Sequence, residues 1–110
     1  MPRFACKKDM NHDEIARAFL SIGWDVIDTY QVGQLVPGFP DLIVTRGASY
    51  ETCEMVVGCH PVVLGIEVKG PGGRLTPDER MFAAGHPDWV PVVVRTVDDV
   101  LELSGMAEEG

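Results

Sequence analysis

Cysteine, basic side chains and long apolar runs are all scarce in this chain of 110 residues. Its 3 cysteines are an odd number, which does not suggest a disulfide framework. No apolar stretch approaches the roughly 18 residues that a membrane-spanning helix needs. The N-terminal residues also lack the apolar core of a signal peptide, so we expect a cytoplasmic protein without membrane contact.

A structural zinc site has weak support. Cys53, Cys59 and His60 lie close together in the sequence. Their spacing is not that of a CxxC pair, and a fourth ligand is not evident. The sequence therefore favours buried or loop thiols over a zinc site.

The shortage of basic residues argues against extensive electrostatic binding of nucleic acid. Lys and Arg number 9 against 17 Asp and Glu, a net charge of −8, which argues against a broad basic face that coats DNA. Acids in a metal site are neutralised by the metal, and others lie in residues 105–110, an expected flexible acidic tail. A narrow phosphate contact remains possible through the side chains of Arg46, Arg74, Arg80, Lys7 and Lys8. For residues 1–10, which hold both lysines, a solvated arm is favoured over a DNA contact.

The pattern of apolar residues predicts one α/β domain spanning residues 1–110. Ile15, Phe19 and Ile22 follow helical spacing, with Asn11 as N-cap and Glu14 completing a capping box. Later, Thr76-Pro77 opens a second helix, with Glu79 at the capping-box position. The expected strands are 24–30, 41–45, 62–69 and 90–95, and a last helix runs from 96 through 103. The order is α-β-β-β-α-β followed by that helix, with a mixed central sheet flanked by helices.

Two short stretches join apolar strands to ionisable residues: 38–44, reading GFPDLIV, and 65–69, reading GIEVK. Pro40 stiffens the turn that leads through Asp41 into its strand. Glu67 and Lys69 lie two apart, so in a strand they share one face. Two carboxylates and an amine suit Mg²⁺, which takes oxygen ligands, polarises a phosphoryl oxygen and activates water.

Each of these residues also has a purely structural interpretation. Asp41 alone would be an ordinary turn aspartate after proline. Glu67 and Lys69 alone would be a pair at the end of a buried strand, where charges are costly unless paired or metal-bound. Such a pair would not explain Asp41 beside it, so the combination favours the metal site.

Taken in order, Pro40-Asp41 and Glu67-Val68-Lys69 resemble the PD-(D/E)XK nuclease motif. The flanking sequences GFPDLIV and IEVK, with LTPDE at 75–79, are similar to the VRR-NUC family, over about Asn11 to Leu103. The resemblance implies a restriction-endonuclease-like core. Relatives usually have a shorter hairpin where this chain has residues 46–61, which therefore look like an insertion or extended hairpin.

The resemblance also implies roles for individual residues. Asp41, Glu67, the Val68 carbonyl and Glu14 would bind Mg²⁺ or Mn²⁺, although Glu14 could serve only as a cap. Lys69 would position or activate water. Family members usually have glutamine at the position of Glu79, so Glu79 could replace it, add a metal ligand, or only close its capping box.

The function implied is that of a metal-dependent endodeoxyribonuclease. Small stand-alone relatives, from bacteria or phages, resemble structure-selective enzymes that cut branched DNA, either flaps or Holliday junctions. Symmetric cleavage of a junction needs two active sites, so a homodimer in a bacterial or phage-infected cell is expected. The alternatives are a degenerate nuclease fold that binds nucleic acid or protein without cutting, and an exonuclease or RNase.

Overall fold

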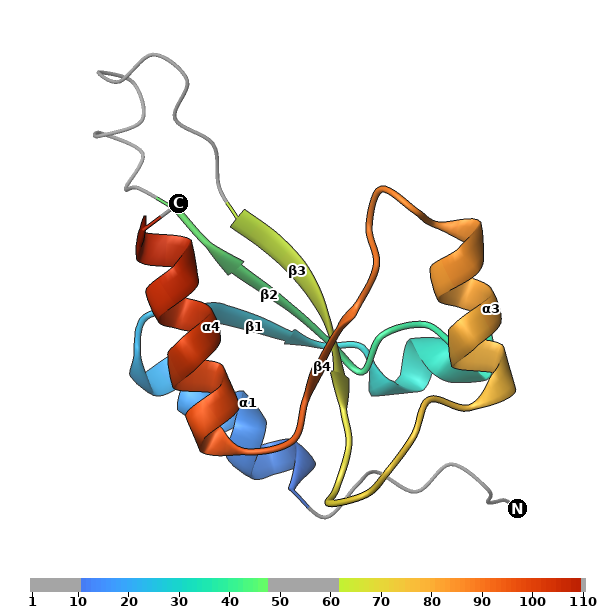
Figure 1. The fold of residues 1–110 in the computed structure, drawn as a ribbon, viewed down its shortest axis with the longest axis horizontal. Coiled ribbons are helices and arrows are strands. Elements are labelled where there is room, and N and C mark those ends of the chain that lie inside the picture. Colours follow the sequence, from blue (N-terminus) through green and yellow to red (C-terminus); the bar gives the residue numbers. More distant parts are fainter. Residues whose placement is uncertain (1–10, 48–61, 110) are drawn as a thin grey trace.

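The computed structural model describes residues 11–47 and 62–109, with side chains through residue 105 (Figure 1). Predictions that concern Lys7, Lys8, Cys53, Cys59 and His60 lie outside the described residues, as does most of the 46–61 connection. The elements in chain order are α1 (His12–Ser21), β1 (Asp25–Asp28), the 3₁₀ helix η1 (Tyr30–Gln34), β2 (Leu42–Arg46), β3 (Val62–Val68), α3 (Pro77–Gly85), β4 (Val92–Val94) and α4 (Val97–Glu109).

The four strands form one mixed sheet in the order β1-β2-β3-β4. The pairs β1–β2 and β2–β3 are antiparallel, whereas β3–β4 is parallel and is connected through α3. Figure 1 shows α1 and α4 together, with α3 apart from them. The α/β fold class with a mixed sheet is confirmed, and the arrangement is consistent with a restriction-endonuclease-like core.

The main core lies between the sheet and the pair α1 and α4. Trp24 is buried there, and its indole N–H donates to Ser104 Oγ at 2.8 Å, so its polar atom is satisfied. Ser104 in turn donates to the Val100 carbonyl within α4. The buried apolar residues of this core are Ile15, Phe19, Trp24, Leu42, Val44, Ile66, Val68, Val94 and Val100.

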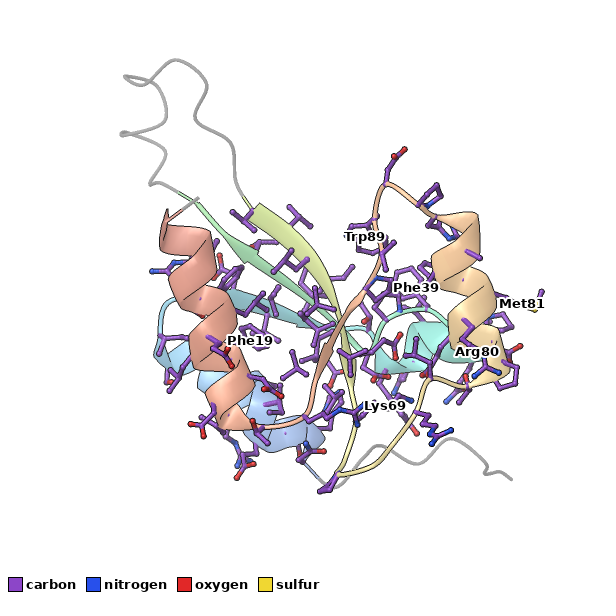
Figure 2. The ribbon with its side chains drawn as sticks, in the orientation of Figure 1. Phe19, Phe39, Lys69, Arg80, Met81 and Trp89 are labelled. Carbon is purple, nitrogen blue, oxygen red and sulfur yellow. The ribbon has the colours of Figure 1, made fainter. Side chains whose placement is uncertain are left out.

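A second, smaller group of rings holds α3 in place. Phe39 contacts Phe82 edge-on at 5.5 Å and Trp89 at 6.0 Å between ring centroids. His86 stacks on Phe82 at 4.0 Å. Figure 2 shows Phe39 and Trp89 beside α3, away from Phe19 of the main core. This group ties the turn before β2 to the helix that carries Glu79.

Two glycines permit close approaches around that turn. Gly38 has φ +81°, and a Cβ there would overlap the Asp78 carbonyl in the first turn of α3. A Cβ on Gly65 would lie 2.9 Å from the Pro40 ring and 3.2 Å from Trp89. The residues flanking Asp41 thus pack directly on both β3 and α3, which fixes Asp41 relative to the side chains of those elements.

The start of α1 differs from the sequence-based expectation. Asn11 flanks the helix but its side chain makes no cap hydrogen bond, so the predicted capping box with Glu14 was wrong. The Asn11 amide instead donates to the carbonyls of Arg95, at 2.7 Å, and Lys69, at 3.3 Å. The side chain joins α1 to the ends of β3 and β4.

Other helix and strand boundaries also differ from those predicted from the sequence. The first strand ends at Asp28, because Asp28 Oδ1 accepts the Tyr30 N–H and Thr29 N–H turns to the Asp41 carbonyl. The 3₁₀ helix that follows replaces part of an expected loop. The last helix continues to Glu109, through most of the expected acidic tail. Gly105 does not stop it, since one glycine inside a helix costs only about 1 kcal/mol.

Candidate active site

Asp41 is held at the start of β2 by hydrogen bonds to neighbouring segments. Its N–H donates to the Ile66 carbonyl at 2.9 Å, and its carbonyl accepts the Thr29 N–H at 3.0 Å. Oδ2 accepts the Val68 N–H at 2.9 Å, which draws the carboxylate to the end of β3. Burial raises the pKa of Asp41, and the Val68 hydrogen bond opposes this rise.

Glu67 lies one residue before Val68 on the same strand and is 1 % exposed. No N–H or O–H donor contacts either of its carboxylate oxygens, and the neighbouring Glu79 carboxylate can bond Glu67 only when Glu67 is protonated. Burial, then a side-chain hydrogen bond to Glu79 and the negative charges of Asp41 and Glu79, raise the pKa of Glu67 to about 10. A buried carboxyl group without a partner is costly, and such groups occur in native proteins where an ion, a water or a reaction uses them.

Lys69 and Glu79 form an ion pair at this end of the sheet. Lys69 Nζ lies 2.7 Å from Glu79 Oε1, and both side chains are largely buried. Burial by itself would lower the pKa of Lys69, but the hydrogen bond and charge of Glu79 outweigh it, so that pKa is raised. Burial likewise acts to raise the pKa of Glu79, yet bonds from its neighbours leave it lowered. Lys69 is therefore an ammonium and Glu79 a carboxylate.

Glu79 also closes the predicted capping box, which is confirmed. Its Oε1 accepts the Thr76 N–H at 2.8 Å, and Thr76 Oγ1 accepts the Glu79 N–H at 3.2 Å. One carboxylate oxygen thus both caps α3 and contacts Lys69. The two roles weighed for Glu79, helix cap and contact with a site residue, therefore occur together.

The Val68 carbonyl has the orientation that a ligand would need. In a strand the N–H and C=O of one residue point to the same side. Because the Val68 N–H donates to Asp41, its carbonyl also lies on the Asp41 side of β3. The structure brings together Asp41, Glu67, Val68, Lys69 and Glu79, and Figure 2 shows Lys69 at the end of β3.

The other expected residues are not in this group. Glu14 is exposed on α1, and its metal-ligand role stays an untested prediction. Arg74 is exposed on the segment after Lys69, and Arg80 is exposed on α3, where Nη1 donates to the Leu75 carbonyl. Arg46 lies at the far end of β2, about 17 Å from Asp41 at 3.4 Å per residue, with its guanidinium over the Trp24 ring.

His12 was missed by the sequence analysis. It is 2 % exposed in the first turn of α1, and its ring contacts that of Tyr30 edge-on at 6.2 Å. The signal was present in the sequence, because His12 lies three residues before Ile15 on the same helical stripe. Extending that stripe backwards predicts that His12, rather than Glu14, faces the sheet.

The donor set fits a hydrated magnesium or manganese ion better than a closed protein cage. Within 11–47 and 62–109, no group of three or more His, Cys, Asp or Glu side chains is arranged to enclose a metal. Mg²⁺ usually keeps several waters and needs only one or two carboxylates. Asp41 and the unpartnered oxygens of Glu67 meet that requirement.

Comparison with known proteins assigns the chain to a family. The sequence model of the VRR-NUC domain family matches residues 6–88, so the chain belongs to that family. The family indicates a nuclease of the PD-(D/E)XK type. Neither the curated proteins nor the solved structures gave a significant match. Among the described residues, no helix is long and apolar enough to cross a membrane.

We expect Glu79→Gln to keep most of the cleavage activity, within about threefold. A glutamine oxygen can accept both the Thr76 N–H and the Lys69 ammonium, as Glu79 Oε1 does. Glu79→Ala is the matched control, since it removes both contacts and should cost about 1 kcal/mol of unfolding free energy for the cap alone. Activity assays and thermal melts of the two variants check this. Loss of cleavage in Glu79→Gln would show that the negative charge itself is required.

Proposed function

We propose that this protein is a metal-dependent endodeoxyribonuclease that hydrolyses phosphodiester bonds in branched DNA. The observation that carries the proposal is the juxtaposition of Asp41, Glu67 and Lys69 at one end of the sheet. Three observations make up this juxtaposition. They are the hydrogen bond from the Val68 N–H to Asp41, the buried Glu67 carboxylate that no donor contacts, and the buried Lys69 amine. Support for a nuclease comes independently from the family match.

Asp41 and Glu67, with the Val68 carbonyl, would hold Mg²⁺ or Mn²⁺. When bound, such an ion polarises a phosphoryl oxygen and lowers the pKa of a bound water. Asp41 is fixed for this task through both its backbone and its Oδ2. Glu67 is buried, so little water screens its attraction for a cation.

Lys69 would orient the attacking water or the phosphate. An ammonium has three N–H donors, and the contact with Glu79 occupies one. The remaining donors are available to oxygens that become more negative in the transition state. Glu79 holds the amine at the end of β3, so that the donor is already in position when DNA binds.

Contact with DNA would be local. Arg74 and Arg80 lie on the segment and helix that follow Lys69, and both are exposed. With a net charge of −8, this protein has little long-range attraction for DNA. We therefore propose recognition of a branched structure, a flap or Holliday junction, by a homodimer that brings two such surfaces to one substrate.

The test is cleavage of a labelled panel: duplex, flap, four-way junction and single strand, each with Mg²⁺, Mn²⁺ or EDTA. We expect metal-dependent cutting, strongest on a branched substrate, and abolished by Asp41→Asn. End-labelled linear and circular DNA distinguishes endonuclease from exonuclease, and an RNA strand tests RNase activity. Tight binding of junctions without cutting under any metal would instead favour a non-cleaving binding module.

A further inference from the structure

The first turn of α1 has two buried polar atoms without a hydrogen-bond partner, Asn11 Oδ1 and His12 Nε2. Leaving such an atom unsatisfied costs about 1–3 kcal/mol. The Glu67 carboxylate oxygens are in the same condition. When several buried polar groups without partners lie at one site, a water or ion bound by all of them can satisfy their hydrogen-bonding capacity.

Hydrogen bonds and ring contacts locate His12 close to the candidate metal ligands. Its neighbour Asn11 donates to the Lys69 carbonyl, so the first turn of α1 lies against the end of β3. On its other side, the His12 ring meets Tyr30, which follows Thr29. Thr29 N–H bonds the Asp41 carbonyl. His12 therefore lies near the end of β3, against the segment from Asp28 to Tyr30 that follows β1.

The electrostatics agree with this location. Burial is the main influence on the pKa of Asp41 and raises it, but His12 is among the groups whose charge lowers it. This contribution belongs to a charged imidazole, and because a Coulomb interaction weakens with distance, it indicates that the two side chains lie near each other. Glu14 instead lies on the exposed side of α1.

A purely structural role for His12 accounts for only one of its nitrogens. Nδ1 lies 3.3 Å from Asp13 Oδ1, a contact that favours the tautomer with its proton on Nδ1. Nε2 lies 3.8 Å from Asp28 Oδ1, which is beyond hydrogen-bonding distance. In this tautomer Nε2 is an acceptor that no donor among the described residues contacts.

We propose that His12 Nε2 accepts a hydrogen bond from a water of the hydrated divalent cation held by Asp41 and Glu67. The α1 contribution to the site is thus an imidazole acting through water, rather than the Glu14 carboxylate acting as a ligand. This inference rests on the proposed function, because it presumes that the cation binds. It makes His12 a positioning residue for the metal-bound water.

The test is Mn²⁺ binding without DNA, by electron paramagnetic resonance and calorimetry. His12→Leu keeps an apolar side chain of similar size but removes the acceptor, and we expect its affinity for Mn²⁺ to fall 10–100-fold. His12→Gln keeps an acceptor and should recover most of that loss. His86→Gln, which changes a histidine bonded to Phe82 on α3, is the control and should bind as wild type does. Melts in EDTA establish that each variant is folded.

A second measurement needs no variant. In ¹⁵N spectra of the wild-type histidines, Mg²⁺ should shift the Nε2 resonance of His12 and leave that of His86 in place. Wild-type Mn²⁺ affinity in His12→Leu, or an unmoved His12 resonance at saturating Mg²⁺, would overturn the proposed role of His12 alone. Failure of the wild type to bind either metal would overturn the proposed nuclease function as well, so the two failures are distinguishable.

Discussion

Glu67→Gln should abolish cleavage and, at the same time, stabilise the metal-free protein. The pKa of Glu67 is raised to about 10 in the fold, from an ordinary value of 4.5. Its contribution to stability is therefore complete below about pH 4.5 and is lost progressively as the pH rises towards 10. At pH 7 the cost is about 3 kcal/mol, at 1.36 kcal/mol per pH unit. The glutamine variant does not incur that cost.

Thermal melts with EDTA and with Mg²⁺ measure this effect. In EDTA we expect the Tm of Glu67→Gln to exceed that of the wild type by roughly 10 °C at pH 7, and the gap to close near pH 4.5. Added Mg²⁺ should raise the Tm of the wild type only. Asp41→Asn is a useful comparison, because the Val68 N–H bond opposes the rise in the pKa of Asp41, so its neutralisation should stabilise less than that of Glu67. An unchanged or lower Tm for Glu67→Gln in EDTA would contradict the conclusion that the buried Glu67 carboxyl group destabilises the metal-free protein at pH 7.

Lys69→Met should lower the cleavage rate by roughly 10²–10⁴-fold, the range found for removing a catalytic donor or proton-transfer group. It should also destabilise the protein in EDTA by about 3 kcal/mol, since Glu79 is left largely buried without its partner 2.7 Å away. The Asp41 carboxylate adds negative charge at the same place. Methionine retains much of the volume of lysine, so the loss reports on charge rather than on a cavity.

The double variant Lys69→Met with Glu79→Gln separates the two effects. Neutralising Glu79 removes the unpaired charge and keeps the capping bond to Thr76. We expect the denaturation midpoint to return close to the wild-type value, while the cleavage rate stays as low as that of Lys69→Met. Recovery of cleavage in the double variant would show that Lys69 serves only to neutralise Glu79, and substantial activity in Lys69→Met alone would exclude the catalytic role.

The group of Asp41, Glu67 and Lys69 could be predicted because the relevant geometry is local. Residues two apart in a strand share a face whatever the rest of the chain does. Pro40 and the apolar run after Asp41 likewise mark a turn entering a strand. Only the pairing of the two strands was needed in addition, and the register Leu42 with Ile66 places Asp41 beside Glu67 and Val68.

The role of Asn11 at the start of α1 could not be predicted from local rules, although the helical stripe through Ile15 indicates that His12 is buried. Asn11 has a good capping side chain, but the carbonyls of Lys69 and Arg95 compete for it, and these are distant in the sequence. Once Asn11 faces the sheet, His12 is buried and Glu14 faces solvent. Tertiary hydrogen bonds thus decided the helix start, whereas the Thr76–Glu79 cap formed as expected, with Lys69 contacting the same carboxylate oxygen without displacing it.

The sheet register separates the long 46–61 connection from the chemistry. Arg46 and Val62, on either side of that connection, are direct partners in the β2–β3 ladder, so it leaves and rejoins the sheet at one place. The site lies at the opposite end of the same two strands. Changes of length in this segment can therefore accumulate over evolution without shifting the candidate catalytic residues. For the same reason, the segment is a natural position for a fluorescent label or a fused domain.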